Sequence, residues 1–187
     1  SSGINHTPMR EKVMICEPAT PAQELDCARQ ILGNLAKQAF RRPITEDDLA
    51  APMAFFAQGR EQGSFDAGIK NGMMAILASP KFLFRGELVP QDAEPGSVLA
   101  ISDLELASRL SFFLWSTVPD DELVDLAARG ELRANLQQQV ERMLADPRAA
   151  ALVDNFVFQW LRLRDLENID PDPEIFANYR PGLLQAF

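Results

Sequence analysis

The stretch S-D-L-E-L-A-S-R-L-S-F-F-L-W-S, residues 102–116, decides the fold class of this chain. Ser102 followed by Glu105 is the pattern of a capping box, in which each side chain bonds the other residue's backbone N–H at a helix start. One apolar stripe of helical period follows, at Leu106, Ala107, Leu110, Phe113 and Leu114. Three more apolar residues lie outside this stripe, namely Leu104, Phe112 and Trp115. A helix that is apolar on more than one side is expected to lie between other helices.

Helix-start patterns recur through the rest of the chain. Thr45 and Ser64 each precede a segment with apolar residues at helical spacing. L-A-S-P-K at 77–81 and L-A-D-P-R at 144–148 place Ser or Asp directly before proline, which is typical of an N-cap and the first residue of a new helix. Strand-like alternation is nearly absent. We therefore expect an all-α, irregular helical bundle of about seven helices, with at most a short N-terminal strand in V-M-I-C at 13–16.

The longest turn-rich stretch inside the chain contains Pro90, Pro95 and Gly96 and predicts a boundary between two helical parts. The expected organisation is an N-terminal extension or remnant of an upstream domain at 1–20, a first helical subdomain at 21–88, a linker at 89–101, and a second helical subdomain at 102–187, truncated at its C-terminal end. The last long helix is expected to begin near Pro147. Its buried stripe is predicted at Leu152, Val153, Phe156, Val157, Trp160 and Leu161.

The overall charge excludes some classes of partner. The 187 residues carry 27 acidic and 18 basic side chains, for a formal net charge of −9. Nucleic-acid affinity comes mostly from Lys and Arg, so a nucleic-acid partner is not expected. No apolar run approaches the roughly 20 residues that a membrane-spanning helix needs.

The two cysteines, Cys16 and Cys27, flank a proline-containing turn. In an oxidising compartment they are candidates for a disulfide, which would stabilise the fold by about 2 to 3 kcal/mol. Two buried thiols remain the alternative, because sequence does not supply the Cα separation that a bridge requires. A zinc site is disfavoured, since two cysteines and the lone His6 do not fill a four-ligand shell.

No catalytic residue is predicted. The lone histidine, His6, lies in the opening segment, which excludes Ser-His-Asp and Cys-His machinery within this chain. Paired carboxylates acting in hydrolysis are an alternative, with candidates Asp120, Asp121, Asp165 and Glu167. The cluster at Asp120 is better explained by favourable interaction with the positive end of a helix dipole.

A second acidic cluster lies in a proline-stiffened loop near the C-terminus. Its alternate carboxylates suit a hard cation such as Ca²⁺. They are Asp165, Glu167, Asp170, Asp172 and Glu174. The segment lacks the glycine turn and the terminal Glu spacing of an EF-hand, and a solvated loop is the competing interpretation. No other cofactor is expected within this chain.

Aromatic side chains are the candidates for an interaction surface. Phe112, Trp115 and Phe158 lie in helical segments and could form a docking face for a partner. The competing interpretation is that they belong to the core, as aromatic residues at helical spacing usually do.

Several motifs together resemble a known family. They are A-K-Q-A-F-R-R-P-I-T, A-I-L-A-S-P-K-F-L-F-R, D-L-E-L-A-S-R-L-S-F-F-L-W-S-T-V-P-D-D-E-L, V-E-R-M-L-A-D-P-R and N-F-V-F-Q-W-L-R-L-R. From about Met14 to the C-terminus the chain is similar to consecutive domains of unknown function in large bacterial proteins associated with Planctomycete-type cytochrome c domains. The resemblance implies an exported, periplasmic protein of several modules, some members of which include a haem domain. It supplies no catalytic residues, and this chain lacks the C-x-x-C-H motif that attaches c-type haem.

The leading hypothesis is therefore a non-catalytic helical module of a larger exported protein, which docks a neighbouring domain or subunit, a c-type cytochrome among the candidates. The alternatives are an enzyme fragment that uses paired carboxylates and a calcium-stabilised module.

Overall fold

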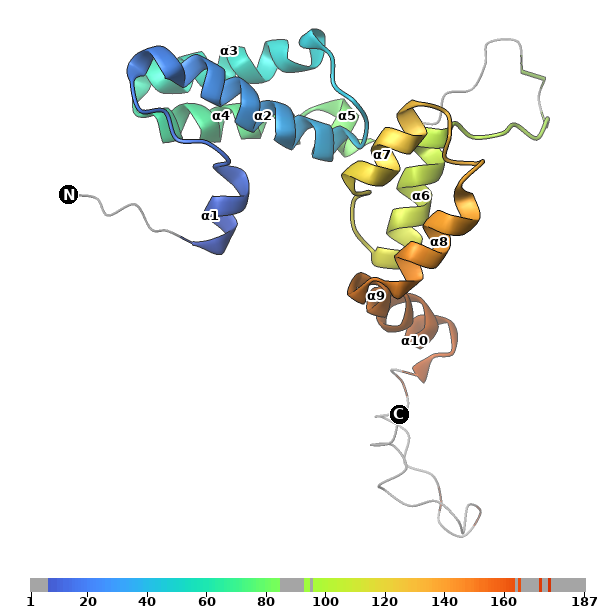
Figure 1. Ribbon diagram of the computed structural model, residues 1–187. Coiled ribbons are helices and arrows are strands. Elements are labelled where there is room, and N and C mark those ends of the chain that lie inside the picture. The colour runs from blue at the N-terminus through green and yellow to red at the C-terminus, as the bar shows by residue number, and fades with distance from the viewer. Residues whose placement is uncertain are drawn as a thin grey trace.

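The computed structural model of the chain describes residues 7–84, 93–94, 96–163, 165, 172 and 175 (Figure 1). All regular structure in these residues is helical, and no strand occurs among them, which confirms the all-α prediction. The strand considered at 13–16 is wrong. Val13 is the last residue of helix α1 (Pro8–Val13), because Thr7 accepts a hydrogen bond from the Arg10 N–H and Pro8 occupies the first helical position.

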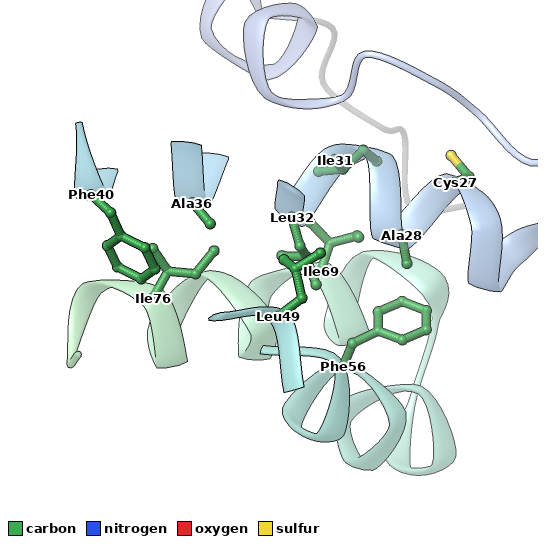
Figure 2. Packing of buried hydrophobic residues seen from close by; sticks show 10 residues of the cluster. All are labelled: Cys27, Ala28, Ile31, Leu32, Ala36, Phe40, Leu49, Phe56, Ile69 and Ile76. Carbon is green, nitrogen blue, oxygen red and sulfur yellow. The ribbon is translucent and has the colours of Figure 1, made fainter. Parts of the chain in front are cut away.

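Three long helices form the first group, and Figure 1 shows them side by side. The helical elements here are a 3₁₀ turn (Pro21–Gln23), α2 (Glu24–Phe40), α3 (Glu46–Gln62), α4 (Phe65–Leu77) and the short α5 (Pro80–Leu83). Their buried side chains form one cluster (Figure 2), made of Cys27, Ala28, Ile31, Leu32, Ala36, Phe40, Leu49, Phe56, Ile69 and Ile76.

Glycines let α3 and α4 approach closely. A Cβ placed on Gly68 would lie 2.7 Å from a ring carbon of Phe56 and 2.9 Å from its carbonyl oxygen. One placed on Gly72 would lie 2.6 Å from the side chain of Leu32 on α2 and 3.1 Å from the carbonyl oxygen of Pro52 on α3. Since packed atoms do not come this close, both positions require the absence of a side chain.

The second group has its own core. Its helices are α6 (Asp103–Trp115), α7 (Asp121–Ala128), α8 (Leu136–Ala145), a 3₁₀ turn (Pro147–Ala149), α9 (Ala150–Leu152), a π-helical turn (Val153–Val157) and α10 (Phe158–Trp160). The buried residues are Ala107, Leu114, Trp115, Leu123, Ala127, Leu132 and Met143. The predicted capping box is confirmed, because the Ser102 N–H donates to Glu105 over 2.6 Å and the Glu105 N–H donates to the Ser102 hydroxyl over 3.2 Å. The caps predicted before Pro80 and Pro147 are confirmed as well.

The last helix differs from the prediction in two respects. Residues 147–160 form one run of helical turns that changes from 3₁₀ to α to π hydrogen bonding, so the structure divides the chain more finely than the seven helices expected. The predicted burial is wrong for Val153, Phe156, Trp160 and Leu161, all of which are exposed. The second core reaches this segment only at its first turns, through Ala149 and Leu152, so these four later side chains stay exposed.

One buried carboxylate joins three segments of the first group. Asp48 accepts hydrogen bonds from the Arg42 guanidinium over 2.9 Å, from the Lys81 ammonium, and from the Thr45 N–H over 2.9 Å. Its side chain is almost fully buried. The hydrogen bonds from Arg42, together with those from Lys81 and Thr45, outweigh the effect of burial and hold the pKa of Asp48 far below its ordinary value. Asp48 is therefore charged at all but strongly acidic pH.

Candidate functional site

Trp115 lies in the core of the second group of helices. It is 3% exposed, and its indole N–H donates to the Met143 carbonyl over 2.9 Å. The guanidinium of Arg148 lies 3.5 Å from the centre of the indole ring and covers it. The apolar stripe predicted for α6 did not include Trp115. The structure buries Trp115 on the same side of the helix as the small polar residues Ser108 and Ser111, which an apolar pattern does not reveal.

An exposed aromatic stack lies beside the other two candidates. Phe112 is 38% exposed and Phe158 is half-buried. The ring centres of Phe113 and Phe156 are 5.6 Å apart, edge to face, and those of Phe156 and Trp160 are 5.9 Å apart and stacked. These three residues are 52%, 45% and 70% exposed. Phe113, Phe156 and Trp160 are called the aromatic face below.

Two local features position the aromatic face. The π-helical turn contains Phe156 and joins α9 to α10, so that Phe156 and Trp160 stack along one side of the helix. The side chain of Asn155 donates a hydrogen bond to the Ser116 hydroxyl over 2.9 Å, just after the end of α6, where Ser116 adopts φ +53°. This bond ties the C-terminal helix to the end of α6, which carries Phe113.

Sequence reasoning assigned Phe113, Phe156 and Trp160 to buried stripes. Their spacing along the helices is the same as that of core residues. An apolar stripe with this spacing is buried only where another helix packs against it. No described residue supplies that opposing helix. Large exposed apolar groups gathered in one place are uncommon on a free surface and are typical of a contact site.

The acidic cluster at the start of α7 is neutralised by neighbours. Asp120 caps the helix by accepting from the Leu123 N–H over 3.1 Å, and it binds Arg142 over 2.8 Å. Partial burial favours the neutral acid, but the hydrogen bonds from Arg142 and Leu123 outweigh it and keep the pKa of Asp120 below its ordinary value. Asp121 pairs with Lys37 over 2.7 Å. A general acid needs a raised pKa, so the lowered pKa of Asp120 does not favour acid catalysis by that residue.

A polar hollow of about 360 Å³ lies between α7 and α8, next to this cluster. Its carboxylates are also paired: Glu122 accepts from Gln139 over 2.7 Å, and Asp125 lies 3.5 Å from Lys37. Arg129 on its rim pairs with Glu131. The charged side chains that line the hollow are therefore already bonded to neighbouring residues of the chain.

The calcium candidates fall largely outside the described residues, which include Asp165 and Asp172 but not Glu167, Asp170 or Glu174. Asp165 pairs with Arg162 over 3.2 Å. No group of three or more potential metal ligands occurs in the part of the chain that the structure describes.

Cys16 and Cys27 are joined by a disulfide, with their Cα atoms 5.9 Å apart. Cys27 is buried in α2, whereas Cys16 is half-buried in the segment after α1. The bond therefore ties the N-terminal arm to the first core. Among the described helices none is long and apolar enough to cross a membrane.

Comparison with known families matches two consecutive parts of the chain. Residues 27–87 match PSD5, a protein of unknown function (DUF1595), and residues 101–187 match PSD4, a protein of unknown function (DUF1592). The first match begins within α2 and continues through α5, and the second includes the aromatic face. No curated protein and no solved structure matches the chain.

Proposed function

We propose that this chain is a non-catalytic helical module of a larger exported protein and that it docks a neighbouring domain or subunit through the aromatic face. The exposed stack of Phe113, Phe156 and Trp160 is the observation that carries the proposal. The disulfide supports export, because such bonds persist in oxidising compartments. The family resemblance makes a c-type cytochrome domain the candidate partner.

The size of the aromatic face indicates what kind of contact it makes. A fully covered aromatic side chain buries about 150–250 Å², and these three are roughly half exposed, so covering them removes roughly 300 Å² from water. At about 25 cal/mol per Å² this contributes about 7 kcal/mol. Association of free partners costs about 4–15 kcal/mol, so the face alone supports only weak binding between separate chains. It suits a partner held nearby in the same polypeptide or assembly, where the effective concentration is high.

Charge also favours a particular class of partner. The formal net charge of −9 steers a positively charged partner toward the module. The aromatic face then supplies the short-range contact. Complexes that combine long-range charge attraction with a small apolar contact area are typically transient.

The test uses two side chains whose removal does not disturb the core. The tagged chain and a Phe156→Ser/Trp160→Ser variant are each incubated with periplasmic extract of the source organism, and retained material is identified by mass spectrometry and visible absorption. Phe84→Ser is the matched control, because Phe84 is an exposed aromatic residue at the end of α5, in the first group.

We expect a haem protein or a covalently neighbouring module to be retained by the wild type and by Phe84→Ser, and to fall at least about tenfold for the double variant. Equal retention by the double variant and the wild type would show that the aromatic face is not the docking site.

A further inference from the structure

A second apolar surface lies on the first group of helices, between α1 and α4. It is a groove of about 350 Å³. One wall is made by Met9, Val13 and Met14, and the other by Met73, Met74 and Leu77. Methionine side chains adapt to irregular apolar partners, and grooves lined by them are typical of sites that bind an amphipathic helix. This α1–α4 groove is distinct from the aromatic face.

The α1 wall is held in place by few interactions. No residue of α1 is buried. Arg10 pairs with Asp66 at the start of α4 over 2.9 Å, and Val13 and Met14 pack partly against the first core. The covalent link is the Cys16–Cys27 disulfide, which fixes the segment after α1 to α2. Without it, an exposed six-residue helix has too little buried surface to stay in place.

One lysine in the lining of the groove, Lys70, has no ion-pair partner among the described residues. In a chain of net charge −9, nearly every described Lys and Arg is engaged with another group. Lys12 and Lys70 are the exceptions within the described residues, since neither forms an ion pair there. Lys70 lines the groove and Lys12 lies on α1. Lys70 therefore brings an unpaired positive charge into the lining of the groove.

The length of the groove limits the size of its occupant. Residues 66–77 of α4 line it, and at 1.5 Å per residue they extend about 17 Å. This length matches about three turns of a helix, with apolar anchors at i, i+4 and i+7. An acidic residue flanking those anchors would pair with Lys70, which lines the groove.

We propose that the α1–α4 groove binds an acidic amphipathic helix of a partner protein, and that the Cys16–Cys27 disulfide is required because it holds the α1 wall. The partner that this chemistry selects differs in charge from the one proposed for the aromatic face. The two surfaces can therefore be tested separately.

The probe is a fluorescent, end-blocked helical peptide of about 14 residues, long enough for the three turns that the groove accommodates, with Leu at the anchor positions and Glu beside them. A matched peptide carries Lys in place of every Glu. Binding to the full chain is measured by fluorescence anisotropy at low salt. We expect the Glu peptide to bind at least about tenfold more tightly than the Lys peptide, which corresponds to about 1.4 kcal/mol.

Three variants locate the binding. Lys70→Glu should weaken binding of the Glu peptide about tenfold, whereas Arg129→Glu, with the same change in net charge on the second group of helices, should not. Met74→Glu places a charge on an exposed groove position and should abolish binding without altering the circular dichroism spectrum. Cys16→Ser should weaken binding about tenfold or more while the α2–α4 core stays helical.

Each opposite result overturns the proposal. Equal affinity for the two peptides, or equal effects of Lys70→Glu and Arg129→Glu, would show that Lys70 does not select the ligand. Unchanged binding by Cys16→Ser would remove the role of the disulfide. Binding to phosphatidylglycerol vesicles but to neither peptide would identify a lipid surface as the occupant instead of a protein helix.

Discussion

Two glycine-to-alanine substitutions should change stability in opposite directions. Gly33 lies within α2 and Gly68 within α4, and neither has a positive φ. In a helix, alanine is favoured over glycine by about 1 kcal/mol. The sign of each change therefore depends on the space available for the added methyl group.

The structure gives different answers at the two positions. A Cβ on Gly33 would lie 3.5 Å from Ile44 and 3.9 Å from Leu49, which is ordinary van der Waals contact. Gly33→Ala should thus stabilise the fold by up to about 1 kcal/mol. A Cβ on Gly68 would meet both the ring and the backbone oxygen of Phe56, and a backbone atom between two packed helices has little freedom to move. Overpacking costs about 1–3 kcal/mol, so Gly68→Ala should be destabilising overall by about 1 kcal/mol.

Urea unfolding followed by circular dichroism measures both changes against the wild type. The two variants should differ by about 2 kcal/mol in the free energy of unfolding, with midpoints on opposite sides of the wild-type midpoint. Stabilisation by Gly68→Ala as large as that by Gly33→Ala would refute the close packing of α3 on α4.

Two further predictions concern buried polar contacts. Asp48→Asn should cost about 2 kcal/mol at neutral pH, because it removes the charge that Arg42 and Lys81 share. The pKa of Asp48 is lowered in the folded state, so the stabilisation that its charge provides is complete above about pH 4. Below that pH it declines by at most about 1.4 kcal/mol per pH unit. The difference in the free energy of urea unfolding between the wild type and Asp48→Asn should therefore become smaller as the pH falls. Trp115→Phe should cost about 1–2 kcal/mol in thermal or urea unfolding, because the Met143 carbonyl keeps only its longer hydrogen bond of 3.3 Å.

The features that the sequence predicted well are local. A capping box involves residues three positions apart, and a Ser or Asp before proline determines its own helix start, so Ser102, Ser79 and Asp146 could be assigned without the fold. The short α1 was missed because most of its residues after Pro8 are polar, and its last residue, Val13, begins the apolar run V-M-I-C that also suits a strand.

The features that the sequence did not predict depend on what lies opposite each residue. Trp115 and Trp160 both have the helical spacing of core residues, yet one is buried under Arg148 and the other is exposed. The pairing of Cys16 with Cys27 depends on a distance between α2 and the arm before it, which no sequence pattern supplies. The aromatic face and the α1–α4 groove could be recognised only after the helices were placed.

Oxidative footprinting of Trp160 in the native, full-length polypeptide tests the central claim most directly. Trp160 is open in the isolated chain, whereas Trp115 is buried and provides an internal reference. If the aromatic face is a docking site, hydroxyl-radical labelling of Trp160 should fall at least about fivefold in the native assembly relative to the isolated chain, while labelling of Phe84 is unchanged. Equal labelling of Trp160 in the two preparations would contradict the proposed function.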